Sequence, residues 1–315
     1  MNKLNILVTG ANGFIGKELV LKLRSLGFEV RCAFRNKKGA DTESTNSVYI
    51  GDISDKTDWG MALNGIDVVI HLAGFAHIKT AAKQDRFDAL RKVNVHGSRR
   101  LAQMAAAMGV KRFIFLSSIK VNGEKGVRPF TEKDPSNPQD AYAISKWEAE
   151  NAVFGIAKNT GMEVVILRTP LVYGQNVKAN FKDLIKIAFS GMPLPLKGIN
   201  NKRSFIYVGN LVDAISVCVF HPAAANEVFL LSDCQDISTP ALIKLIAAAG
   251  NKKARLFFMH PCILRFLAKT FGKAESWDKL TSSLLIDSAK FRNLLHWSPP
   301  FTLEEGIKQT LFRSI

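Results

Sequence analysis

Two side chains with complementary acid–base chemistry stand four residues apart in the middle of the sequence. Tyr142 and Lys146 are the first and last residues of the segment Tyr-Ala-Ile-Ser-Lys, and this spacing places both on one face of a helix. A phenol with a pKa of about 10 is a poor acid–base group at neutral pH, but a nearby ammonium charge favours its phenolate form. On its own such a pair is most often an exposed helix face, so its surroundings decide its meaning.

A pair of serines ends an apolar run upstream of this segment. Residues 113–116 read Phe-Ile-Phe-Leu, and Ser117 and Ser118 follow directly. Ligands of open parallel sheets bind at the carboxyl ends of the strands, so Ser118 is placed to hydrogen-bond a reacting oxygen. We therefore predict that Ser118, Tyr142 and Lys146 are the catalytic residues.

A glycine-rich turn near the N-terminus has the context of a dinucleotide site. It follows an apolar run, precedes a helical pattern, and carries Gly10, Gly13 and Gly16 at spacings of three and three. Gly10 suits a tight turn, Gly13 lets the backbone approach a pyrophosphate, and Gly16 lets the helix pack on the strand. The alternative is a purely structural glycine turn. The spacing is typical of short-chain dehydrogenases.

The second apolar run ends without the carboxylate that normally holds the ribose of NAD. Phe34 stands at that place, and Arg31, Arg35 and Lys37 surround it. Guanidinium groups bind phosphate in a fork, so these cations favour NADP(H) over NAD(H). The alternative is that they form a solvated loop face.

Alternation of apolar runs with helix-length segments predicts an α/β fold, a Rossmann-type doubly wound parallel sheet with helices on both faces. Strands are expected at 5–9, 29–34, 48–50, 67–71, 112–117 and 163–168, and helices at 15–26, 87–108 and 142–159. The regularity weakens after Gly174, where loops rich in proline and glycine begin. We predict a dinucleotide-binding domain over 1–170 and a smaller α/β substrate lobe over 171–315, interleaved with the first.

The composition narrows the classes of partner. The net charge of +16 suits anionic small ligands, nucleic acid or an anionic membrane surface, but no nucleic-acid-binding motif accompanies it. No run reaches the roughly 18 apolar residues of a spanning helix, although residues 260–273 resemble an interfacial helix and leave peripheral association open. The four cysteines are neither paired nor at metal-ligand spacing, so we expect no metal and a cytoplasmic location.

These motifs together resemble the extended short-chain dehydrogenase/reductases, which include UDP-galactose 4-epimerases and sugar-nucleotide dehydratases. The resemblance also covers Gly51-Asp-Ile53, His71-Leu-Ala-Gly74, Asn94, residues 168–174 and residues 203–214. It implies a homodimer joined through helices 87–108 and 142–159. It implies cofactor contacts from Gly10, Asn12, Gly13, Phe14, Ile15, Gly16, Arg35, Asp52, Ile53, Leu72, Ala73, Gly74, Asn94, Ser117, Tyr142, Lys146 and Pro170. It implies substrate contacts from His77, Ser118, Lys120, Tyr142, Asn180 and Arg203, with Arg203 on the nucleotide diphosphate and Asn180 on the sugar phosphates.

One departure from the family pattern separates its reactions. Dehydratases carry an Asp-Glu pair just after the active-site serine or threonine, whereas this chain has Ile119 and Lys120 there. Several segments, including 117–124 and 138–150, look most like bacterial polysaccharide-cluster enzymes that reduce UDP-4-keto-6-deoxy-N-acetylglucosamine. Lys120 is either a feature of that subgroup or a solvent-facing loop residue.

We therefore expect NAD(P)H-dependent reduction of the C4 keto group of a UDP-4-keto-6-deoxy-N-acetylhexosamine for surface polysaccharide synthesis. The alternative is a UDP-hexose or UDP-N-acetylhexosamine 4-epimerase with tightly bound NAD, which would use the same residues. A third hypothesis, from another class, is a cofactor-binding scaffold protein without catalysis, and the intact Ser118, Tyr142 and Lys146 argue against it.

Overall fold

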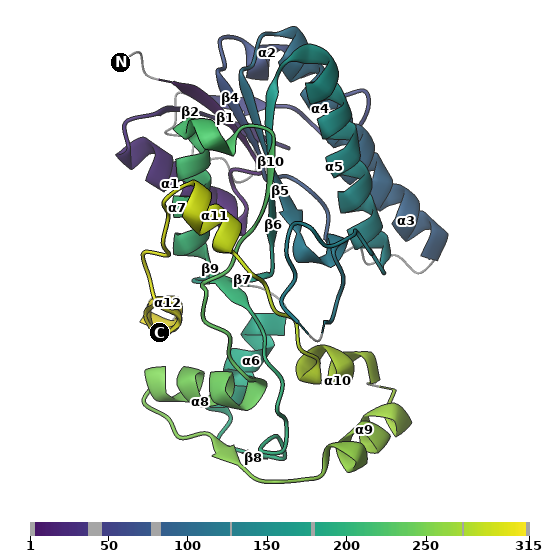
Figure 1. The fold of residues 1–315 in the computed structure, drawn as a ribbon, viewed down its shortest axis with the longest axis vertical. Coiled ribbons are helices and arrows are strands. Elements are labelled where there is room, and N and C mark those ends of the chain that lie inside the picture. Colours follow the sequence, from purple (N-terminus) through teal and green to yellow (C-terminus); the bar gives the residue numbers. More distant parts are fainter. Residues whose placement is uncertain are drawn as a thin grey trace.

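The apolar runs of the sequence form one parallel sheet. The structure, a computed structural model, describes residues 4–36, 46–76, 83–126, 128–177, 180–272 and 274–312. Seven strands pair in parallel in the order β10-β6-β5-β4-β1-β2-β3 (Figure 1). Their bounds are Asn5–Thr9 (β1), Glu29–Phe34 (β2), Ser47–Tyr49 (β3), Val68–His71 (β4), Arg112–Ser118 (β5), Glu163–Thr169 (β6) and Glu227–Leu230 (β10). The predicted fold class is confirmed.

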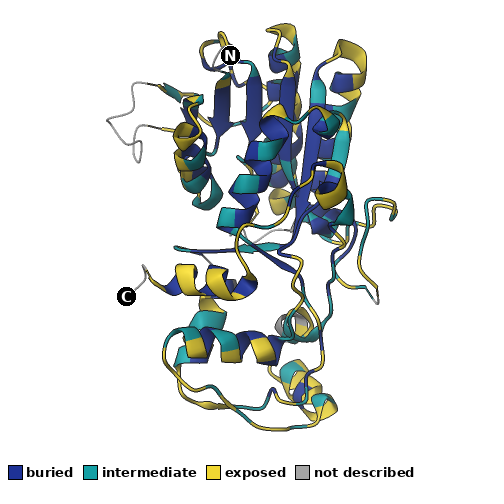
Figure 2. Ribbon diagram, turned by 60° about the vertical axis from the view of Figure 1, so that its left-hand side comes forward, coloured by how far each residue is buried: buried dark blue, intermediate teal, exposed yellow. Residues whose placement is uncertain are grey.

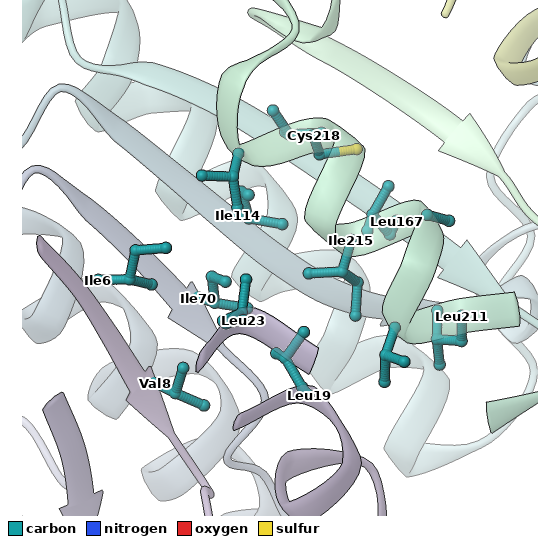
Figure 3. Close-up of a cluster of buried hydrophobic side chains, with 14 of the residues drawn as sticks. Ile6, Val8, Leu19, Leu23, Ile70, Ile114, Leu167, Leu211, Ile215 and Cys218 are labelled. Atoms are coloured by element: carbon teal, nitrogen blue, oxygen red, sulfur yellow. The ribbon is translucent and has the colours of Figure 1, made fainter. Parts of the chain in front are cut away.

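Helices cover both faces of the sheet, and alternate residues of each strand face opposite layers. Ile6 and Val8 of β1 join one buried cluster, and Leu7 joins the other. The first layer contains α1 (Phe14–Ser25), α7 (Val208–Phe220) and α11 (Ala289–Leu294), and Figure 3 shows its core. The second contains α2 (Gly60–Leu63), α4 (Ser98–Ala107) and α5 (Ala141–Thr160). Burial on both faces explains why the strands read as continuous apolar runs (Figure 2).

The segment after β4 is not the single helix that its periodicity predicts. It divides into α3 (Lys83–Arg91), a six-residue π-helical turn (Lys92–Gly97) and α4. The turn presses against the loop after β3, since a Cβ on Gly97 would lie 2.3 Å from Cγ2 of Ile53. Turns of the π type are rare and often mark functional sites. Here the turn brings Asn94 to the edge of the sheet where ligands bind.

The second half of the chain builds a smaller lobe below the sheet. It contains two short parallel pairs, β7 (Leu171–Tyr173) with β9 (Phe205–Tyr207) and β8 (Pro193–Leu194) with β11 (Arg255–Leu256). Its helices are α6 (Asn180–Phe189), α8 (Thr239–Ala249), α9 (Pro261–Thr270), α10 (Ala274–Thr281) and α12 (Leu303–Phe312). Two short 3₁₀ turns lie at Ile119–Val121 and Pro222–Ala224. The chain is interleaved, because α7 and β10 return to the large sheet.

A buried carboxylate organises the junction between the two units. Asp233 accepts hydrogen bonds from the hydroxyl of Tyr173 at 2.8 Å, from Nδ2 of Asn210 at 2.7 Å and from the backbone N–H of Tyr207 at 2.9 Å. Burial raises the pKa of Asp233, and these donors oppose the rise. This network fixes β9 and α7 to the end of β10 and so sets the position of the small lobe under the sheet.

Candidate active site

The glycine turn lies where the strand order of the sheet reverses. β1 is the strand from which β2 and β4 continue in opposite directions, and ligands of such folds bind at this switch point. Gly10 has φ of +68°, a conformation that favours glycine, and a Cβ on Gly16 would lie 2.2 Å from the carbonyl oxygen of Gly10. Both glycines are therefore required by the backbone, in the roles that the sequence predicts.

A cavity of about 410 Å³ opens at this turn and fits the adenosine half of a dinucleotide. Glycines form much of its wall, and a Cβ on Gly10 would meet the backbone nitrogen of Ala73 at 3.0 Å. The predicted cofactor residues that line it are Gly10, Asn12, Arg35, Asp52, Ile53, Ala73 and Gly74. Ala33, Ile50, Phe75, Ala89, Lys92 and Val93 also line it and were not predicted. Phe14, Ile15 and Gly16 form the first turn of α1, next to Gly13, and Leu72 directly follows β4.

The cations at the end of β2 have different partners. Nη1 of Arg31 donates to the carbonyl oxygens of Ala62 at 3.1 Å and Asn64 at 2.6 Å, so Arg31 caps α2 and does not face the cavity. Nε of Arg35 pairs with Oδ1 of Asp52 at 2.5 Å, and both side chains are exposed. Phe34 is buried, and Lys37 lies outside the described residues. Of the three cations, only Arg35 is shown beside the adenosine cavity.

Asn94 joins the loop after β4, which contains Phe75, to α5, the helix that carries Tyr142. Its side chain is buried, accepts from the N–H of Phe75 at 2.8 Å and donates to the carbonyl oxygen of Phe75 at 2.9 Å. Its Nδ2 also donates to Oγ of Ser145 at 2.9 Å, and Ser145 in turn donates to the carbonyl oxygen of Tyr142. Its amide is thus used within the protein, and the residue positions the loop over the cleft.

Ser118 and Tyr142 come together across the end of β5. Asp140 begins α5 by accepting from the N–H of Ala143 at 2.7 Å, and this N-cap places Tyr142 in the first turn. A hydrogen bond from Ser118 reaches the phenol and lowers its pKa, but burial and the charge of Asp140 outweigh it and raise the pKa to about 12. The structure therefore brings together two of the three predicted catalytic residues.

Lys146, the third, lies one turn further along α5 in the interior. It is 5% exposed, and its Nζ is 3.9 Å from the ring centroid of Phe115 in β5. Burial lowers the pKa of Lys146 to about 7, and the charge of Glu150 opposes this shift. Lys146 can thus change its charge near neutral pH, one helical turn from Tyr142.

Beneath Lys146 lies a buried ion pair that sequence motifs did not single out. Nη2 of Arg168 in β6 donates to Oε2 of Glu150 at 2.6 Å, and its Nη1 donates to Oδ1 of Asn122 at 3.0 Å. The hydroxyl of Ser117 also donates to Glu150, so this predicted cofactor residue directs its side chain into the pair. Both charged side chains are almost fully buried. The spacing Tyr-x-x-x-Lys-x-x-x-Glu, which continues one helix face, was the available signal.

Lys120 lies between two carboxylates next to the phenol. Its Nζ is 2.5 Å from Oε1 of Glu124 and 2.6 Å from Oδ2 of Asp140, and these partners raise the pKa of Lys120 against its partial burial. Burial is the main cause of the raised pKa of Tyr142, and the charge of Asp140, the partner of Lys120, adds to it. The predicted direct contact of Lys120 with substrate stays a prediction.

The remaining predicted substrate residues lie in the small lobe or outside the described part. Nη1 of Arg203 donates to the carbonyl oxygens of Lys279 at 2.6 Å and Ser282 at 3.2 Å, which ties β9 to the end of α10. Burial lowers the pKa of Arg203, and the charge of Glu124, a partner of Lys120, opposes this shift. Asn180 begins α6, and Pro170 is buried between β6 and β7. His77 lies outside the described residues.

Among the described residues, no group of three histidine, cysteine, aspartate or glutamate side chains could hold a metal ion. Within the same part of the chain, none of the helices combines the length and the apolar character needed to cross a bilayer.

Replacing Arg168 by Met tests the buried pair. The substitution leaves the Glu150 carboxylate buried without a counterion, so we expect the free energy of unfolding to fall by about 3–5 kcal/mol. The double variant Arg168→Met/Glu150→Met removes both charges and should recover a large part of that loss. Urea unfolding followed by circular dichroism measures both. The single variant Glu150→Met completes the comparison. If the free energy of unfolding lost in the double variant equals the sum of the losses in Arg168→Met and Glu150→Met, the two groups do not interact.

Comparison with known proteins places the chain in a family. The model of the NAD dependent epimerase/dehydratase family matches residues 6–231. The UDP-glucose 4-epimerase of Vibrio cholerae is 42% identical over 311 residues, which cover 97% of this chain and 94% of that protein. The N-acetyl-alpha-D-glucosaminyl-diphospho-ditrans,octacis-undecaprenol 4-epimerase of Escherichia coli O157:H7 is 28% identical over 324 residues, covering 98% and 94%.

Solved structures agree with this placement. A UDP-glucose 4-epimerase from Thermotoga maritima, determined with UDP-glucose, superposes with a TM-score of 0.77 at 25% identity and covers 99% of each chain. A UDP-glucuronic acid 4-epimerase from Bacillus cereus in complex with NAD has the same fold, with a TM-score of 0.78 at 23% identity over 98% of this chain and 95% of that one. The chain therefore belongs to the NAD dependent epimerase/dehydratase family, an assignment that also agrees with its glycine turn and its Tyr142–Lys146 pair.

Proposed function

We propose that this protein inverts the configuration at C4 of a UDP-hexose or UDP-N-acetylhexosamine, with NAD as its resident cofactor. The hydrogen-bonded Ser118–Tyr142 pair beside the buried Lys146 carries the proposal, because it is suited to removing a proton from a sugar hydroxyl and returning it. The 42% identity to a UDP-glucose 4-epimerase over nearly the whole chain favours epimerisation over the keto reduction that the motifs first suggested.

The residues around the glycine turn would hold the cofactor. Gly10, Gly13 and Gly16 leave its pyrophosphate close to the N-terminus of α1, and the cavity beside Asp52 and Gly74 suits its adenosine. When bound, NAD would supply the acceptor and donor for the hydride at C4. The observed NAD complex of the Bacillus cereus epimerase supports this choice of cofactor.

Proton transfer falls to this chain's own side chains. The phenolate of Tyr142 would accept the proton of the C4 hydroxyl, while Ser118 orients that oxygen. A protonated Lys146 would favour the phenolate through its positive charge, and Glu150 favours that protonated state. After the keto-sugar turns over, Tyr142 would return the proton to the oxygen on C4. Ile119 and Lys120 stand where the dehydratases carry their Asp-Glu pair, so this chain lacks the carboxylates with which those enzymes eliminate water.

The second candidate is reduction of a UDP-4-keto-6-deoxy-N-acetylhexosamine, and one observation favours it. The end of β2 lacks a carboxylate for the ribose, and the exposed Arg35 is available to a 2′-phosphate if it leaves Asp52. This would suit NADP(H), which a reductase must exchange at every turnover. The reductase would place its product among precursors of surface polysaccharide.

Three further expectations accompany the proposal. A homodimer would join copies through α3, α4 and α5, the substrate would be held through Arg203 and Asn180, and the protein would act in the cytoplasm. The first two rest on the family resemblance of the motifs described above, and the third rests on the unpaired cysteines. A scaffold without catalysis would not need a phenol, a serine hydroxyl and a buried ammonium at one strand end.

The bound dinucleotide distinguishes the two reactions. We expect the purified, denatured protein to release NAD, and the native protein to equilibrate UDP-glucose with UDP-galactose, or their N-acetyl forms, without net change in absorbance at 340 nm. Nuclear magnetic resonance of the C4 epimers measures this. A protein that releases no dinucleotide and consumes NADPH in proportion to an added UDP-4-keto-6-deoxy-N-acetylhexosamine would instead be the reductase. The Tyr142→Phe variant should be inactive in both assays.

The pH profile tests the electrostatic role of Asp140. Its negative charge raises the pKa of Tyr142, so Asp140→Asn, which keeps the N-cap, should lower that pKa. The acid limb of kcat against pH should then move to lower pH by about one unit. Glu124→Gln serves as the matched control, since it also removes a partner of Lys120 but does not act on Tyr142. Equal shifts in both variants would contradict a specific effect of Asp140.

A further inference from the structure

Helix α9 and the segment that leads into it lie at the end of the molecule opposite the sheet (Figure 1), and they carry several exposed apolar side chains. Phe266 is 67% exposed and Phe271 is 75% exposed, which is unusual for large aromatic residues. We call this surface the α9 patch, and it consists of the exposed residues Phe257, Phe258, Ile263, Phe266, Leu267 and Phe271. No part of the proposed reaction uses it.

The α9 helix is built so that one apolar face stays outside. His260 caps it by accepting from the N–H of Cys262, and Pro261 occupies its first position. Leu264 packs inward at 8% exposure, whereas Ile263, Phe266 and Leu267 share an adjoining, exposed side through their i, i+3, i+4 spacing. The helix therefore has an inner contact that holds it and an apolar side that stays exposed.

The stretch of chain that contains this face carries positive charge and no negative charge. Residues 237–273 contain no aspartate or glutamate, and the chain as a whole carries a net charge of +16. Within that stretch Arg265 and Lys269 lie on α9 itself, four residues apart and both exposed. The other exposed cations are Lys244, Lys252, Lys253 and Arg255. None of these six forms a salt bridge with a described residue, although Lys252 packs on the ring of Phe189. The two cations on α9 itself are therefore not neutralised by a described carboxylate.

We propose that the α9 patch docks the protein on an anionic lipid surface. A helix with exposed aromatic and aliphatic residues on one side and cations on its flank matches the boundary between lipid headgroups and acyl chains. The ten residues of α9 are too few to span a bilayer, so the contact is peripheral. A symmetric interface between two copies would bring the same unpaired cations together, which disfavours self-association through this face.

The two parts of the patch make separable contributions. Each cation near an anionic surface strengthens binding about fivefold at low ionic strength. Burying a phenylalanine side chain in the headgroup region strengthens it by about tenfold or more. Reversing the charges of Arg265 and Lys269 should therefore abolish most of the binding to anionic vesicles at low salt. Replacing Phe266 and Phe271 by serine should also abolish most of the binding, although this variant keeps both positive charges.

Co-sedimentation with vesicles tests the docking on the full chain. We expect the wild type to sediment with vesicles of phosphatidylcholine and phosphatidylglycerol, to do so less at high salt, and to remain in solution with phosphatidylcholine alone. Arg265→Glu/Lys269→Glu and Phe266→Ser/Phe271→Ser should each reduce binding at least tenfold. The matched control is Lys133→Glu/Lys158→Glu, which changes the net charge by the same amount at exposed sites far from α9 in sequence. This control should bind the vesicles much better than the Arg265→Glu/Lys269→Glu variant does.

A second measurement guards against loss of folding. Cys262 on α9 is exposed, and a polarity-sensitive fluorophore attached to it in a Cys234→Ser background should shift to the blue on anionic vesicles. Thermal melts should show that the α9 variants fold as the wild type does. The proposal is overturned if the wild type does not sediment, if the α9 variants sediment as well as the control, or if the Phe266→Ser/Phe271→Ser variant converts a wild-type dimer into a monomer.

Discussion

Helix α5 carries an ammonium group into the interior of the protein, and the rest of the site depends on how that charge is balanced. Lys146 is buried against the ring of Phe115, where an isolated charge is costly. Glu150 one turn away offsets the cost, and Arg168 in turn holds Glu150. A row of charges therefore runs from β6 through α5 to the phenol. Because burial leaves the pKa of Lys146 at about 7, a small change in its surroundings decides whether the lysine is charged.

A second set of charges approaches the phenol from the opposite side. Asp140 and Lys120 lie beside Tyr142, and Glu124 connects them electrostatically with Arg203 of the small lobe. Arg203 is also bonded to the end of α10, so a phosphate that attracted Arg203 would be sensed by both the lobe and the acid–base residues. If Arg203 holds a substrate phosphate as proposed, Glu124 and Lys120 would link substrate binding to proton transfer at Tyr142.

The large sheet and the grouping of Ser118 with the helix that carries Tyr142 and Lys146 could be predicted because their signals are local. Strands β1 and β2 begin and end at the predicted residues, since their side chains are buried on both faces and turn residues flank them. Gly10 and the Tyr142–Lys146 spacing likewise report on one turn and one helix face. Arg31 shows what local signals miss, because its carbonyl partners on α2 are about thirty positions away. The return of β10 to the sheet and the inward turn of Ser117 toward Glu150 depend on similarly distant contacts.

The claim that Tyr142 exchanges a proton with the C4 hydroxyl while hydride leaves the same carbon is the centre of this account. Rapid mixing of the NAD-loaded protein with UDP-glucose, followed at 340 nm, measures the reduced cofactor formed in the first half of the reaction. The account predicts a transient absorbance at 340 nm in the wild type and none in Tyr142→Phe. In Lys146→Met the transient should also be lost, and it should return only in part when the pH is raised. A transient of wild-type rate and size in Tyr142→Phe would contradict it.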